Sequence, residues 1–175
     1  MFRLVLVALM AIFANAYDLR LDGGHIIAHT EVLGDSKIDP LTKNINATLV
    51  KEDSIESLNG KVWIQTLDLK STNEKRDVNM YELLNATIHP NISFELKSVQ
   101  KVQDAYTLNG ILTLNGISKE VSSNVKIVEG SDSLSMDGGF SIELTDYGIE
   151  PPKMFFLKVR NKIDISYFLS FKKAN

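Results

Sequence analysis

The chain has 175 residues, no cysteine and a formal net charge of −3 at pH 7. A chain of this length can bury the core of one domain. The absence of cysteine excludes disulfide bonds, a thiol nucleophile, thiolate metal ligands and a lipid anchor on an N-terminal cysteine. Because the chain is slightly acidic and has no basic cluster, we do not expect it to bind nucleic acid.

The first sixteen residues have the pattern of a secretory signal peptide. Arg3 precedes an unbroken apolar run from Leu4 to Phe13, and Ala14-Asn15-Ala16 is a small-x-small cleavage site. The apolar run is shorter than an ordinary membrane-spanning helix. We therefore expect cleavage after Ala16 and a single mature domain over residues 17–175 with no integral membrane span. The alternative is a buried N-terminal strand or an uncleaved anchor.

The first third of this domain contains short stretches of strand character. Residues 24–33 form the first, although either of its two alternating sets of side chains could face inward. Residues 45–49 form a second. Asn59-Gly60 predicts a tight turn, and residues 62–66 follow as a third strand. Trp63 is the only tryptophan. Its place on the opposite face of that strand suits either a partner surface or a contact with a loop, and the sequence leaves both open.

Residues 72–85 interrupt the strand pattern and predict one short helix. Thr72 is the expected N-cap, and His89-Pro90 disfavours helix beyond this point. The apolar side chains at helical spacing are Met80, Leu83 and Leu84. We expect this helix to lie across one end of the fold as a lid or plug.

From residue 92 onward, five stretches alternate strictly between apolar and mostly polar side chains. A period of two indicates strands with one dry face and one wet face. Five such strands with little helix between them predict an all-β, antiparallel sheet that closes on itself and can enclose one apolar ligand. The expected inward positions are Ile92, Phe94, Leu96, Tyr106, Leu108, Gly110, Leu112, Leu114, Val121, Ser123, Val125, Ile127, Leu134, Met136, Gly138, Phe140, Ile142, Ile163, Ile165, Tyr167, Leu169 and Phe171.

Two polar groups are candidate site residues. His25 and His29 share a strand face but are about 13 Å apart, from ~3.3 Å per residue, so one metal ion cannot bind both. They are either polar surface residues or, if that face points inward, hydrogen-bonding points inside an apolar cavity. Arg76-Asp77 is either a solvated pair or an arginine at the barrel mouth, matched to a phosphate or carboxylate.

The sequence contains no motif that indicates catalysis. It has no nucleophile elbow, phosphate-binding loop or dinucleotide fingerprint, and its carboxylates are scattered over outward strand positions. We therefore expect a non-enzymatic protein without a cofactor or metal.

Four segments, in this order, resemble one known family. Ser71 to Asp77 resembles the segment after its third strand, and His89 to Phe94 resembles its aromatic-Pro-x-Ile-Thr-Phe strand entry. Tyr106 to Val121 preserves Tyr-x-x-x-Gly-x-Leu-Thr-x-x-Gly-Ile-Ser-Lys-x-Val, and Phe140 to Ile149 leads into an Asp-aromatic-Gly turn. Together with the signal peptide, they resemble the YceI-like family, which consists of periplasmic, lipocalin-like proteins that bind polyisoprenoids.

The chain departs from the family pattern mainly around the presumed mouth of the barrel. Asn79 stands where the family often has histidine, and Leu144 stands where arginine is common. The aromatic pair that usually follows Arg-Asp is missing. These departures leave the fold unaffected and put the identity of the ligand in question.

The resemblance implies an eight-stranded lipocalin-like barrel with one short helix near one end, and a periplasmic carrier for a polyprenyl phosphate or an isoprenoid quinone. Tyr106, His25 and His29 would offer polar contacts, and Arg76 would meet an anionic head group. The small inward residues Gly110, Gly138 and Ser123 would either widen the channel or be offset by large neighbours. The expected channel walls are Ile92, Phe94, Leu96, Leu108, Leu112, Phe140, Ile142 and Ile165.

The alternative function is a non-catalytic interaction protein with a filled barrel, acting through its outer face and loops. A continuous internal cavity would distinguish the two functions, because a filled barrel has none. Whether the protein forms a homodimer is left open by the sequence.

Overall fold

The computed structural model describes residues 16–32, 35–154 and 157–174, so the expected signal peptide lies almost wholly outside the described residues. In the described chain, no helix is both long and apolar enough to cross a bilayer. The strands are β1 (Tyr17–Val32), β2 (Asp35–Ile38), β3 (Leu41–Thr42), β4 (Asn46–Lys51), β5 (Asn59–Gln65), β6 (Asn91–Val102), β7 (Ala105–Leu114), β8 (Ile117–Glu129), β9 (Ser133–Glu143), β10 (Lys153–Met154), β11 (Leu157–Lys158) and β12 (Lys162–Lys173). The helices are α1 (Glu74–Leu83) and three short 3-10 helices, η1 (Ile55–Ser57), η2 (Thr66–Asp68) and η3 (Leu144–Tyr147).

Eight strands close into an antiparallel barrel. Their order is β1-β4-β5-β6-β7-β8-β9-β12, and β12 pairs back with β1 from Leu19–Lys173 to His29–Asp164. Closure removes the exposed sheet edges that an open sheet of this size would have. The expected all-β, eight-stranded barrel with a single short helix is confirmed.

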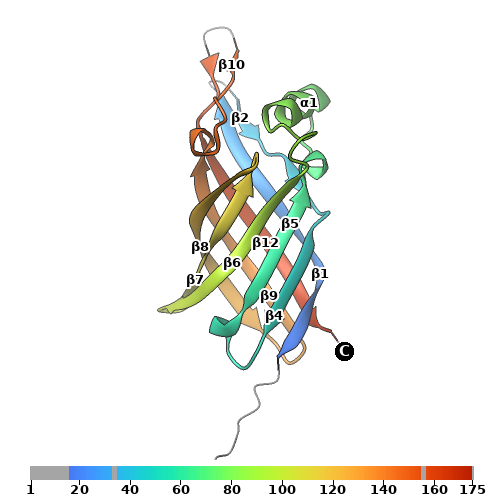
Figure 1. Ribbon diagram of the computed structural model, residues 1–175, viewed down its shortest axis with the longest axis vertical. Coiled ribbons are helices and arrows are strands. Elements are labelled where there is room, and N and C mark those ends of the chain that lie inside the picture. The colour runs from blue at the N-terminus through green and yellow to red at the C-terminus, as the bar shows by residue number, and fades with distance from the viewer. Residues whose placement is uncertain (1–15, 33–34, 155–156, 175) are drawn as a thin grey trace, which may run out of the picture.

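The two ends of the barrel differ, as Figure 1 shows. One end carries α1, β2, η3 and the β10–β11 hairpin, and we call it the helix end. The opposite end carries η1 and the C-terminal end of β12, and we call it the closed end.

The alternating pattern produces two groups of buried apolar side chains. The closed-end cluster is densely filled and includes Leu134 and Phe171, which are 1% and 0% exposed. The helix-end cluster is built around Leu112, Ile142 and Tyr147. Phe94 packs against both clusters, so it marks the boundary between the two halves of the barrel.

The prediction of a tight turn at Asn59-Gly60 is wrong. Both residues lie in β5, and the chain reverses earlier, through η1. Gly60 has φ +130°, and a Cβ there would lie 1.9 Å from the carbonyl oxygen of Thr48. Glycine is therefore needed here because β4 and β5 approach each other closely. From the sequence alone, an Asn-Gly pair in such a contact looks the same as one in a hairpin turn.

The helix α1 is fixed by polar contacts to the segment that leads into it, residues 69–73. Asn73, rather than the expected Thr72, is the N-cap, and its side-chain oxygen accepts a hydrogen bond from the amide of Arg76. The carboxylate of Asp77 accepts from the amide of Ser71 at 3.0 and 3.1 Å. The hydroxyl of Tyr81 lies 2.6 Å from the carbonyl oxygen of Leu69 and donates to it. The Leu41–Lys70 bridge in turn joins this segment to β3, so the helix is held at the end of the barrel.

Candidate functional site

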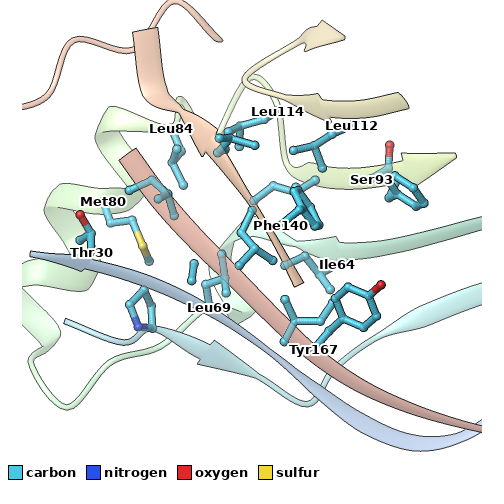
Figure 2. A pocket seen from close by; sticks show the side chains of 18 of the residues that line it. Thr30, Ile64, Leu69, Met80, Leu84, Ser93, Leu112, Leu114, Phe140 and Tyr167 are labelled. Carbon is cyan, nitrogen blue, oxygen red and sulfur yellow. The ribbon is translucent and has the colours of Figure 1, made fainter. Parts of the chain in front are cut away.

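The half of the barrel next to the helix end is hollow. Its cavity has a volume of about 870 Å³, within the range of about 300–1,000 Å³ that is typical of small-molecule sites. Side chains from the barrel strands and from α1 surround it, and most of them are apolar (Figure 2). A cavity of this kind can take a long apolar molecule without any reaction chemistry.

Most of the predicted ligand-binding residues line this cavity. Nine of the twelve do so, and they come from β6, β7, β9, β12 and α1. They are Ile92, Phe94, Leu96, Leu108, Leu112, Phe140, Ile142, Ile165 and Arg76.

Two inward-facing glycines make room for aromatic rings rather than directly for a ligand. A Cβ on Gly110 would lie 2.4 Å from Cζ of Phe94, and a Cβ on Gly138 would lie 2.8 Å from the hydroxyl oxygen of Tyr167. Both rings line the cavity. Of the two expectations for these small residues, the structure therefore supports the one in which large neighbours offset them.

The wall toward the closed end contains one buried polar pair. The hydroxyls of Ser123 and Tyr167 are 2.8 Å apart, and Ser123 lies 3.2 Å from the carbonyl oxygen of Gly139. Burial raises the pKa of Tyr167, against the opposing effect of its hydrogen bond with Ser123. Because both hydroxyls have partners, this part of the wall can face a hydrocarbon without leaving a polar atom unsatisfied.

Polar side chains gather where α1 meets the cavity. Arg76, Asp77, Asn79 and Glu82 line it there, together with Ser71. Met80 on the same helix and Leu84, its C-cap, point into the cavity in Figure 2. The cavity is therefore polar at the helix end and apolar in depth, which is the distribution that an amphiphile with one polar end requires.

The three remaining predicted residues do not line the cavity. Tyr106 faces inward but packs against the closed-end cluster, below the hollow half. In β1 it is Ile26, Ala28 and Thr30 that line the cavity. His25 and His29 therefore lie on the outer face of the barrel, and the expectation that they point inside is corrected.

His29 takes part in an ionic network on that outer face. Its Nδ1 lies 2.5 Å from Asp39 and its Nε2 lies 3.2 Å from Glu31. The hydrogen bonds to Asp39 and then Glu31 raise the pKa of His29. Arg160 extends the network, because it contacts both Glu31 and Asp164. In the described part of the chain, no group of three or more His, Cys, Asp and Glu side chains is arranged to hold a metal ion.

Sequence reasoning missed several lining residues. The inward set of β1 could not be chosen from its own pattern, since both alternating sets contain apolar residues. Its pairing with β12 decides the question, because Ala28 lies opposite Ile165. Trp63, whose position was left open, is half-buried. It borders the cavity, but it alternates with the inward-facing Val62 and Ile64, so its side chain is directed to the other face of β5.

Known proteins share this architecture. The family model for the YceI-like domain matches residues 19–171. A curated relative from Azotobacter vinelandii, named UPF0312 protein, is 31% identical over 99 residues, which cover 51% of this chain and 52% of the relative. The match thus spans about half the length of this relative and of a second one, UPF0312 protein PC1_2518 from Pectobacterium carotovorum.

Two solved structures have the same fold. BcnA from Burkholderia cenocepacia superposes with a TM-score of 0.70 at 13% identity, covering 84% of this chain and 95% of BcnA. A polyisoprenoid binding domain from Saccharophagus degradans, implicated in plant cell wall breakdown, superposes with a TM-score of 0.62 at 9% identity, covering 90% and 99%. At these identities the likeness concerns the fold alone.

Proposed function

Because this chain belongs to the YceI-like family, we propose that it is a non-catalytic carrier that holds one long-chain isoprenoid lipid in the hollow half of its barrel. The ligand class is a polyprenyl phosphate or an isoprenoid quinone. The solved polyisoprenoid binding domain of the same fold supports this class.

The apolar cavity of about 870 Å³ is the observation that carries the proposal. Burying hydrocarbon in it gains about 0.8 kcal/mol per CH₂ group. The branched side chains of Ile92, Leu112 and Ile165 offer many contacts to a methyl-branched chain. The polar residues at the helix end, with Arg76 among them, would meet the head group.

The cavity also favours the carrier over the alternative, an interaction protein with a filled barrel. Such a barrel would leave no hollow half.

We place the protein in the periplasm. The basic residue, apolar run and small-x-small site of residues 1–16 support export, as does the family resemblance. A carrier in that compartment would shield a prenyl chain from water between two membranes.

Native mass spectrometry of the mature protein tests the proposal. The protein is purified from the periplasm without detergent or added lipid, and an organic extract is then analysed by mass. We expect a stoichiometric adduct that contains prenyl units. A protein that is ligand-free and stays so after incubation with ubiquinone and undecaprenyl phosphate would contradict the proposal.

Filling the cavity gives a second test. Leu112→Trp adds bulk inside the hollow half, whereas the neighbouring Ile111→Trp adds the same bulk on the outer face, where Ile111 pairs with Glu95. We expect Leu112→Trp to abolish retention of the ligand while the far-ultraviolet circular dichroism remains that of a β-barrel. Ile111→Trp should retain the ligand. Equal retention by both variants would remove Leu112 from the site.

A further inference from the structure

The barrel wall has a fissure on one side, between β8 and β9. In the described chain these strands pair only from Asn124–Gly139 to Glu129–Leu134. The same register would continue to Ser122–Ser141 and Glu120–Glu143, but no pairs form there. Both strands remain paired on their other sides, with β7 and β12. The fissure is therefore a local separation of two otherwise regular strands at the helix end of the barrel.

A second, smaller pocket of about 310 Å³ occupies this fissure. Its lining comes from the unpaired parts of β8 and β9 and from η3, which contacts both strands. The lining residues are Lys119, Glu120, Val121, Ser122, Ser141, Ile142, Glu143, Asp146 and Tyr147.

The fissure and the central cavity lie back to back. Ile142 lines both of them, and Val121 packs against the helix-end cluster beside it. Apolar side chains, rather than a hydrogen-bonded ladder, thus separate the cavity from the outside here. Where neighbouring strands are paired, parting them would break backbone hydrogen bonds, whereas in the fissure there is no strand ladder to break.

Tyr147 lies in the lining of the fissure, and its hydroxyl group lacks a hydrogen-bond partner in the described part of the chain. Its side chain is 1% exposed, and among the described residues its hydroxyl has no hydrogen-bond partner. Burial, with a contribution from the charge of Asp146, raises the pKa of Tyr147 to about 12. Because a buried hydroxyl without a partner is unfavourable, moving this side chain into water would recover part of that cost.

We propose that this fissure is a lateral port of the cavity, through which a hydrocarbon chain enters and leaves side-on, with Tyr147 as its latch. A long chain could then move sideways through the wall instead of sliding along the whole axis past α1. The proposal rests on the proposed lipid-carrier function and adds the route that the lipid takes.

The port is tested by linking its two sides. Because the chain has no cysteine, Ser122→Cys/Ser141→Cys introduces the only two thiols, one on each side of the fissure. A short bismaleimide then holds the strands together, and the unlinked variant is the first control. The unlinked variant also lacks the hydrogen bonds of Ser122 to Asn109 and of Ser141 to Asp164, so it controls for their loss.

A matched pair in the intact wall is the second control. Thr107 and Asn124 are register partners on β7 and β8, with their side chains in contact on the outer face. Thr107→Cys/Asn124→Cys is linked with the same reagent, so any general stiffening of the barrel by the linker appears in this protein as well.

The readout is the binding and release of a short-chain ubiquinone. Its bound fraction is measured first, at equilibrium, by quenching of Trp63, the only tryptophan. Its release rate is then measured by transfer to excess acceptor vesicles. We expect linking at the fissure to leave the bound fraction unchanged and to slow release by about tenfold or more, while linking the control pair changes neither quantity.

Tyr147→Phe provides a second variant without cross-linking. Removal of the unsatisfied hydroxyl should stabilise the closed fissure, so release should slow while the melting temperature does not fall. If linked and unlinked fissure variants bind ubiquinone and release it at the same rate, the port is wrong and the carrier function stands. If no variant binds ubiquinone or undecaprenyl phosphate, both proposals fail together.

Discussion

At the scale of single residues, the shape of the cavity depends on glycines that lie beside aromatic rings of the neighbouring strand. Gly110 on β7 lies against the ring of Phe94 on β6, and Gly138 on β9 lies against the ring of Tyr167 on β12. The rings contribute area to the cavity wall, and the glycines determine where those rings can lie. Glycine at these positions is therefore part of the site although it does not line it.

Gly110→Ala tests this pairing. The new methyl group would lie 2.4 Å from Cζ of Phe94 and 2.5 Å from the backbone oxygen of Glu95, so ring and strand must both move. We expect a loss of about 1–3 kcal/mol in the free energy of unfolding, as for other overpacked sites. Urea denaturation of the ligand-free protein measures it.

Gly23→Ala is the matched control, because a Cβ there would have no heavy atom within 4 Å. It should change the free energy of unfolding by less than about 0.5 kcal/mol. Equal stability of the two variants would show that Phe94 and its strand relax freely around the added methyl group.

At the scale of elements, the outer ionic network joins segments that are distant in the sequence near the helix end. His29 on β1 contacts Asp39, between β2 and β3, while Arg160 joins Glu31 on β1 to Asp164 on β12. The network thus ties both strands to the segments beside the mouth of the cavity. Its groups are partly exposed, which limits the free energy that each pair contributes.

The raised pKa of His29 predicts a pH dependence with a definite sign. The folded protein binds the imidazole proton more tightly than the unfolded chain, since Asp39 and Glu31 favour the charged ring. The stabilisation is fully present below the unfolded pKa of about 6.5 and is lost as the pH rises through the folded value.

His29→Gln keeps a polar side chain on β1 and removes the titration. Urea denaturation between about pH 6 and pH 9 should show a decline in the free energy of unfolding for the wild type that is smaller in the variant. Identical pH profiles would mean that the contacts of His29 with Asp39 and Glu31 contribute nothing to folding.

The elements also show which features a sequence can predict. Strict alternation placed the inward faces of β7, β9 and β12 correctly, because one face of each strand is buried or half-buried along its length. It could not orient β1, in which both sets of side chains include apolar residues, and it could not reveal that Gly60 serves a contact with β4. Both features depend on the partner strand, which becomes a neighbour only after folding.

Three site residues were misplaced for related reasons. Tyr106 has the expected inward direction, but a period of two does not tell how far along the barrel a side chain lies. His25 and His29 were predicted on the inner face of β1 but lie on its outer face. The fissure between β8 and β9 had no signal at all, since the pattern of Val121 and Ile142 is that of a paired strand.

At the scale of the whole molecule, the barrel consists of two unequal halves. The closed-end cluster fills one half, whereas the helix-end cluster surrounds the cavity and leaves the other half less densely packed. Stability against local opening should therefore differ between the halves of the same strands, and a bound hydrocarbon should act mainly on the hollow half.

Hydrogen exchange with and without ubiquinone measures this difference. In the ligand-free protein, we expect slow exchange for the amides of residues 134–138 on β9 and faster exchange for residues 140–143, which lie beside both the cavity and the fissure. Bound ligand should slow exchange in residues 140–143 and in residues 74–83 of α1, because it supplies the packing partners that the cavity lacks. Residues 134–138 should change little. Uniform slowing along β9 would instead mean that the two halves open together and that ligand binding stabilises the barrel only as a whole.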